Sequence, residues 1–164
     1  MEQSAQFFFS PENRVAPLGI VAMEGAQELA DKIEAHLVRW ANQAGMNIDT
    51  FRIGCSCPRF SSGDGKGILE SSVRGYDLYF VVDVGNYSCT YKYFGQENHM
   101  SPDDHYQDLK RLIQAAMGKA HRITVVMPYP KREVEIVPQL PGIFGLRLRA
   151  AGAAIHGRGQ RGHL

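Results

Sequence analysis

The chain has 164 residues, of which 44% are hydrophobic, which is enough for one domain with a substantial apolar core. Its 18 basic and 17 acidic residues nearly balance, so the overall charge favours neither a nucleic-acid partner nor a membrane surface. No apolar run is long enough to span a membrane, and the first three residues lack the basic start of an export signal. We therefore expect a cytoplasmic protein. Its three cysteines, an odd number in a chain without an export signal, indicate reduced thiols.

The charge is nevertheless distributed unevenly along the chain. From Lys131 onward there are six Lys or Arg and two Glu, a net charge of +4, whereas residues 1–130 carry twelve and fifteen, a net charge of −3. The last segment is also rich in glycine and shows no sustained helical or strand pattern. We therefore divide the chain into a domain at residues 1–129 and an atypical basic tail at residues 130–164.

The first elements are predicted at residues 18–23, an apolar run typical of a strand, and at residues 25–42, a helix. Apolar residues recur in this helix at spacings of three and four: Ala26, Leu29, Ala30, Ile33, Leu37, Trp40 and Ala41. We expect this face, Trp40 included, to pack on a sheet. Residues 49–53 alternate between polar and apolar, which predicts a half-buried strand.

Residues 58–84 predict a glycine-bearing polar loop, an exposed strand, a turn at Arg74 and Gly75, and a strand at 78–82 that is apolar on both faces. Glycines let backbone N–H groups approach a phosphate closely. A Walker loop is excluded, because it needs glycine five residues before its lysine and Ser or Thr after it, whereas Phe60 and Gly67 hold those positions around Lys66. A hairpin loop on an edge strand is the alternative.

The second half of the domain predicts a crossover unit. The aromatic-rich residues 85–95 are expected to form an excursion whose rings pack on the domain or on a second subunit, and we favour the subunit contact. Ser101 is placed to cap a helix at residues 102–117, and Pro102 suits its first position. The predicted buried face of this helix consists of Tyr106, Leu109, Ile113, Ala116 and Met117. Residues 123–127 form the next apolar strand. A strand, a helix and a second strand in this order indicate a parallel sheet in a doubly wound α/β domain.

Two groups of residues are candidate metal ligands: Cys55, Cys57 and Cys89, and His99, Asp103, Asp104 and His105. The cysteines lack the second matching pair that structural zinc sites show. The two aspartates are explained by their position in the first turn of the predicted helix, where they complement its dipole. We therefore predict no metal site.

Two motifs carry a resemblance to a known family. Residues 59–64 read R-F-S-S-G-D and residues 70–75 read E-S-S-V-R-G, followed by an apolar strand. They resemble the amino-terminal domain of the ribose-phosphate diphosphokinases, which reads R-F-S-D-G-E and then E-S-V-R-G. Longer runs, N-H-M-S-P-D-D-H-Y-Q-D-L-K-R and K-A-H-R-I-T-V-V-M-P, are similar to a subgroup found in Gram-positive bacteria. The resemblance covers about Leu18 to Tyr129.

The resemblance implies a phosphoribosyltransferase-like fold, with a mainly parallel sheet flanked by helices. It implies transfer of diphosphate from MgATP to C1 of ribose 5-phosphate, giving phosphoribosyl diphosphate and AMP, with Mg²⁺ as cofactor in a homo-oligomer. Phe60 would pack on adenine, and Ser62 and Asp64 would approach the nucleotide across a subunit boundary. Ser62 replaces an aspartate of the family motif and Asp64 a glutamate, so these two contacts depart from the pattern.

The resemblance stops after Tyr129, and the catalytic residues of the family lie beyond it. The subgroup continues with S-S-R-E-S-L-D-C, which can be written AGC-TCC-CGG-GAA-TCT-TTG-GAC-TGC. Preceded by one C and read in the shifted frame, these codons give Q-L-P-G-I-F-G-L, the residues found at 139–146. We therefore expect a truncated chain whose residues 130–164 are out of frame and disordered, and which is inactive alone. The alternative is a non-catalytic regulatory or assembly subunit of an intact synthetase.

Overall fold

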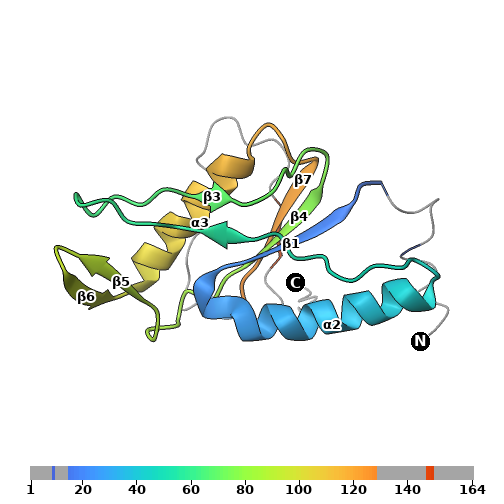
Figure 1. The fold of residues 1–164 in the computed structure, drawn as a ribbon, viewed down its shortest axis with the longest axis horizontal. Coiled ribbons are helices and arrows are strands. Elements are labelled where there is room, and N and C mark those ends of the chain that lie inside the picture. Colours follow the sequence, from blue (N-terminus) through green and yellow to red (C-terminus); the bar gives the residue numbers. More distant parts are fainter. Residues whose placement is uncertain (1–8, 10–14, 129–146, 150–164) are drawn as a thin grey trace, which may run out of the picture.

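A parallel β-sheet forms the centre of the molecule (Figure 1). The structure, a computed structural model, describes residue 9, residues 15–128 and residues 147–149. Within this part the sheet has the order β1, β4, β7, β8, and every neighbouring pair is parallel. The strands are β1 (Leu18–Ala22), β4 (Asp77–Val81), β7 (Arg122–Val126) and β8 (Arg147–Arg149). The predicted α/β class and its first three sheet strands are confirmed.

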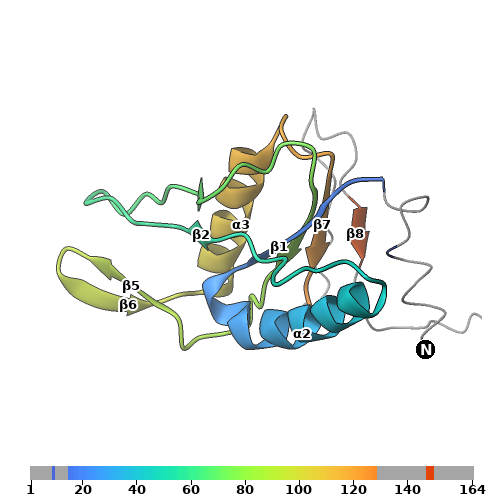
Figure 2. The ribbon, with the colours of Figure 1, turned by 45° about the vertical axis from the view of Figure 1, so that its right-hand side comes forward.

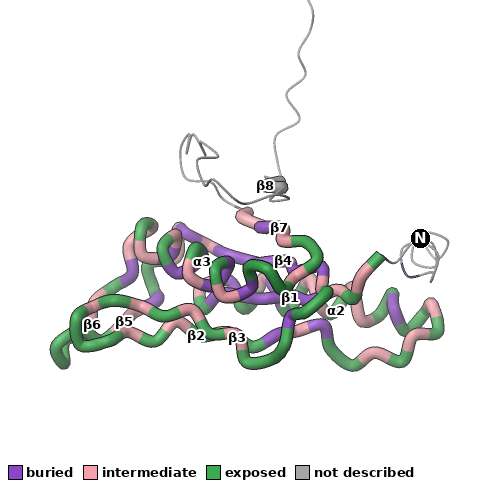
Figure 3. Tube along the Cα trace, turned by 90° about the horizontal axis from the view of Figure 1, so that it is seen from above, coloured by how far each residue is buried: buried purple, intermediate pink, exposed green. Residues whose placement is uncertain are grey.

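Helices cover both faces of this sheet. Helix α2 (Gln27–Gln43) follows a single 3₁₀ turn, η1 (Glu24–Ala26), and α3 (Pro102–Ala116) connects β4 to β7. Because successive strand residues point to opposite faces, Ile20 packs in the cluster that contains the buried side of α2, while Val21 packs with α3. Figure 3 shows that the buried residues gather in β1 and β4, between the two helices. The predicted crossover of strand, helix and strand is confirmed.

Two antiparallel pairs extend from this body. Strand β2 (Cys55–Ser56) pairs with β3 (Ile68–Leu69), and β5 (Thr90–Tyr93) pairs with β6 (Gln96–His99). Figures 1 and 2 show the loop between β2 and β3 and the β5–β6 hairpin extending on the same side of the molecule. The glycine-bearing loop therefore has the geometry of a hairpin.

The predicted strand at residues 49–53 is wrong. Arg52 forms only an isolated parallel bridge to Ile20, whose N–H donates to Phe51 O and whose carbonyl accepts from Ile53 N, both at 2.8 Å. The pairing stops after one bridge because the chain then turns away from β1 and forms β2, which pairs with β3.

Two side chains predicted to be buried are exposed. Trp40 keeps 36% of its surface in solvent, because the buried positions of α2 are Ala30 and Ala41, and Trp40 lies about 100° around the helix from Ala41. Met117 is 48% exposed because α3 ends at Ala116. Conversely, α3 buries His105 and Asp108, which the apolar pattern did not include.

Three residues of the predicted tail belong to the described part of the chain. Arg147–Arg149 form β8 at the edge of the sheet, parallel to β7 and paired with Thr124, Val125 and Val126. The other residues of the 130–164 segment lie outside the described part of the chain. Among the described residues, none of the helices has the length and apolar character needed to cross a membrane.

Candidate functional site

The 58–67 loop, which joins β2 to β3, is an ordered hairpin extension. Arg59 and Gly65 form an antiparallel bridge, and Lys66 N donates to Pro58 O at 3.1 Å. At the tip, Phe60 N donates to Asp64 O at 2.7 Å, and Gly63 N donates to Phe60 O at 2.9 Å. Gly63 has φ +89°, a conformation that favours glycine. The tip is therefore fixed by its own backbone.

The three residues predicted to contact a nucleotide lie together at this tip. Phe60 is 55% exposed, and Ser62 Oγ donates to Asp64 Oδ2 at 2.9 Å. The tip also meets the β5–β6 hairpin, because a Cβ on Gly63 would lie 2.9 Å from the ring of Tyr93. The loop thus presents one large aromatic ring and two polar side chains on its outer surface.

A buried ion pair, not predicted from the sequence, lies beneath the loop. Arg59 and Asp108 each expose 6% of their side chains, and they form a bidentate contact: Nη1 to Oδ1 at 2.6 Å and Nη2 to Oδ2 at 3.0 Å. Arg111 Nη1 donates to the same Oδ1 at 2.8 Å. Arg59 also stacks over Tyr91, 4.9 Å from its ring centre. One carboxylate on α3 therefore serves two guanidinium groups.

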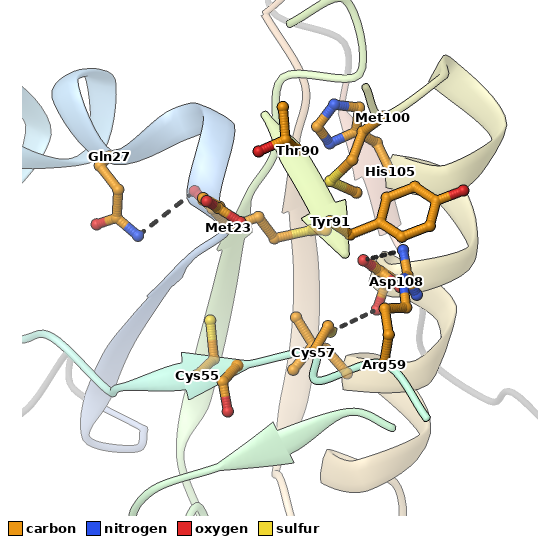
Figure 4. A pocket seen from close by; sticks show the side chains of 13 residues that line it. Met23, Gln27, Cys55, Cys57, Arg59, Thr90, Tyr91, Met100, His105 and Asp108 are labelled. Atoms are coloured by element: carbon orange, nitrogen blue, oxygen red, sulfur yellow. Dashed lines mark hydrogen bonds and ion pairs between the residues drawn. The ribbon is translucent and has the colours of Figure 1, made fainter. Parts of the chain in front are cut away.

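A cavity of about 270 Å³ lies next to this ion pair (Figure 4). It adjoins the carboxyl end of β1, where Met23 and Glu24 follow the strand, and this end of a parallel sheet is where α/β proteins usually bind ligands. Arg59 and Asp108 line it, whereas Phe60, Ser62 and Asp64 do not. The three residues predicted to contact a nucleotide therefore lie outside the lining of the cavity.

The surroundings of Cys55 and Cys57, which line the cavity, raise the pKa of both thiols. Burial, with a smaller contribution from the charge of Glu70, raises the pKa of Cys55 to about 11. Burial and then the charge of Asp108 raise the pKa of Cys57 to about 12. Because the thiolate is the nucleophile and the metal ligand, these side chains remain neutral thiols at physiological pH.

The second group of candidate metal ligands serves structural roles. Asp104 forms a capping box with Ser101: its Oδ2 accepts from Ser101 N at 2.9 Å, and its own N–H donates to Ser101 Oγ at 3.2 Å. Partial burial opposes ionisation of Asp104, but the hydrogen bonds from Ser101 and the charge of Arg59 outweigh it and lower its pKa. His105 is buried and contacts Asn86 O through Nε2 at 2.8 Å. In the described part of the chain, no group of three His, Cys, Asp or Glu side chains could hold a metal ion.

Comparison with known protein families identifies the family of this chain. Residues 18–132 match the family described as the N-terminal domain of ribose phosphate pyrophosphokinase. The matched range contains the sheet strands β1, β4 and β7, both helices and the whole 58–67 loop. No curated protein matches the chain.

Proposed function

Because the chain belongs to the ribose phosphate pyrophosphokinase family, we propose that it carries the nucleotide-contacting part of an enzyme that makes phosphoribosyl diphosphate from MgATP and ribose 5-phosphate. The C1 hydroxyl of the sugar attacks the β-phosphorus of ATP, the bond from that phosphorus to the α–β bridging oxygen breaks, and AMP leaves. Such a transfer depends mainly on positioning the reactants and neutralising the charge of the phosphates.

The exposure of Phe60 carries this proposal. Phe60 keeps 55% of its surface in solvent although it lies on an ordered hairpin tip. A flat ring in this position suits stacking on a base, and the Ser62 hydroxyl and Asp64 carboxylate beside it supply polar contacts. In our proposal Phe60 packs on adenine while Ser62 and Asp64 approach the rest of the nucleotide.

A titration with MgATP tests this role. We expect Phe60→Ala to weaken binding by about 1–3 kcal/mol, the range for loss of one base-stacking aromatic. Ile68→Ala is the matched control, because Ile68 is an exposed apolar residue on the adjoining strand, away from the tip. Equal MgATP affinity in wild type and Phe60→Ala would refute the assignment.

Magnesium enters this proposal only with the nucleotide. The described residues offer no set of three carboxylate, imidazole or thiol ligands, so they do not fit a resident metal ion. We propose that Mg²⁺ arrives bound to ATP as part of the substrate.

We further propose that the chain does not complete the reaction by itself. The chain contains none of the residues that we predict to be catalytic in this family. We also propose that residues from about Pro130 are translated out of frame. The unusual composition of that segment supports the shift, as does the agreement of residues 139–146 with the shifted reading of the family sequence. Resequencing the coding DNA decides the point, and an alternative frame that does not encode the rest of the family would refute it. A release assay for AMP, with ribose 5-phosphate and MgATP, should show no turnover.

A non-catalytic assembly subunit is the second candidate function. The observation that favours it is the apolar surface of the β5–β6 region, where Tyr87, Tyr93 and Phe94 are 52%, 36% and 76% exposed. We propose that this surface joins copies of the chain, or joins the chain to an intact relative in the cytoplasm. Co-purification with a full-length synthetase, weakened by Phe94→Ser, would favour this function over a truncated enzyme.

A further inference from the structure

Two neighbouring side chains of the 58–67 loop, Arg59 and Phe60, point in different directions. Arg59 and Phe60 are consecutive in the 58–67 loop, where Arg59 forms an antiparallel bridge with Gly65, and the very different exposures of their side chains show that they point to opposite sides. The guanidinium of Arg59 is directed inward, with 6% of its side chain exposed, and the ring of Phe60 is directed outward, with 55% exposed. Whatever fixes Arg59 therefore also fixes the direction of Phe60.

Asp108 fixes Arg59 from α3. It binds the guanidinium through both carboxylate oxygens, which restricts the orientation of the planar group as well as its position. Tyr91 closes the other side of the same group. Arg111 holds the carboxylate from one turn further along α3. The contact thus connects the loop to the helix that packs on the central sheet.

The backbone of the 58–67 loop packs closely against Arg59 and Arg111. A Cβ on Gly65 would lie 2.3 Å from Arg59 Nη1 and 2.8 Å from Arg111 Nη1. A Cβ on Gly67 would lie 2.5 Å from the backbone carbonyl of Arg111. The close fit means that displacement of either guanidinium displaces the loop backbone as well.

We infer that Asp108 is a positioning residue, which acts through Arg59 to hold the 58–67 loop in the conformation that presents Phe60. The inference rests on the proposed function, because presentation matters for binding only if Phe60 contacts the nucleotide. Removing the carboxylate leaves two neighbouring guanidinium groups without their buried counter-charge, and that arrangement is unfavourable. Arg59 then leaves its site and the loop loses its order. A loop that is ordered before binding avoids the entropic cost of ordering when the ligand arrives.

Amide hydrogen exchange on the full chain tests the effect on the loop directly. Phe60 and Gly63 are the reporters, because their N–H groups make the hydrogen bonds of the tip. Asp108→Asn should accelerate their exchange at least about tenfold, since it removes the negative charge and one of the two oxygens that accept from Arg59. Exchange in β4 should remain as in wild type. Asp103→Asn is the matched control on the same helix, because Asp103 is exposed and should leave the loop unchanged.

A second variant separates stability from positioning. In Arg59→Met/Asp108→Leu, apolar side chains replace the pair, so folding is expected to recover while the polar link to the loop stays absent. The loop amides should exchange fast in this variant too, and it gives the answer if Asp108→Asn does not fold. Loop exchange at the wild-type rate in a folded variant of either kind overturns the inference.

Binding of MgATP distinguishes this inference from the proposed function. Asp108→Asn should weaken binding in the wild-type background and cause no further loss in the Phe60→Ala background, because the effect passes through Phe60. An equal loss in both backgrounds overturns the inference. If the wild-type chain does not bind MgATP, the proposed function fails, and the exchange rates alone decide whether Asp108 holds the loop.

Discussion

The central sheet and the 58–67 loop are held in place by different forces. In the sheet, Leu78 and Phe80 are fully buried in the cluster that contains the inner face of α3, and apolar burial is the main stabilising term. In the loop, an aromatic ring stays in solvent, and order comes from backbone hydrogen bonds, close glycine contacts and one buried ion pair. The difference separates a scaffold, which hides its large side chains, from a contact surface, which exposes one. Substitutions in the two regions should therefore have different consequences.

The largest effect is expected in the sheet. Phe80→Ala should lower the free energy of unfolding by about 3–5 kcal/mol, because it removes a fully buried ring and leaves a cavity in the centre of the core. Denaturant unfolding followed by circular dichroism measures the change. A loss below about 1 kcal/mol would contradict the contribution of Phe80 to the stability of the core, since surface substitutions produce changes of that size.

A smaller effect is expected where the loop meets α3. Gly67→Ala should cost about 1–3 kcal/mol, because its Cβ would collide with the backbone of Arg111, which cannot move without distorting the helix. The loss should be accompanied by faster hydrogen exchange in the loop. Gly85→Ala is the matched control, because a Cβ there would lie 3.4 Å from Asp83 Oδ1, an ordinary contact. Similar stabilities of the two variants would show that the loop does not depend on the fit at Gly67.

The sequence predicted the sheet better than the loop because the two regions leave different patterns in the chain. Apolar runs marked β1, β4 and β7, and Ser101 with Pro102 marked the start of α3 through purely local chemistry. Trp40 was misplaced, since a helical stripe gives the mean direction of burial but not its width.

The ion pair beneath the loop could not be predicted from such patterns. Arg59 and Asp108 are 49 residues apart, and no local rule joins them. One signal was present: Asp108 occupies the buried stripe of α3, between His105 and Leu112, at helical spacing. A charged residue on an apolar stripe indicates a buried partner, but the sequence alone does not identify that partner. The family motif located Phe60, Ser62 and Asp64, whereas their exposure came from the structure.

The capping box of α3 predicts a modest dependence on pH. The folded pKa of Asp104 is lowered, so its ionised form stabilises the folded state. This contribution is present above the unfolded pKa, near 4, and is lost as the pH falls through the lower folded value. Asp104→Asn should therefore cost on the order of 1 kcal/mol at pH 7 and progressively less below about pH 4. Denaturant unfolding at a series of pH values measures the difference. A constant difference across this range would contradict the role of the carboxylate.

The smallest change in stability is expected at the residue proposed to matter most for binding. Phe60→Ala should alter the free energy of unfolding by no more than about 0.5 kcal/mol, because the ring is mostly exposed and the tip is held by backbone hydrogen bonds. The same substitution, Phe to Ala, thus separates the two regions when it is made at Phe60 and at Phe80 and both variants are unfolded under one set of conditions. A loss at Phe60 comparable to that at Phe80 would mean that the ring serves the fold, and its exposure would no longer support a contact with adenine.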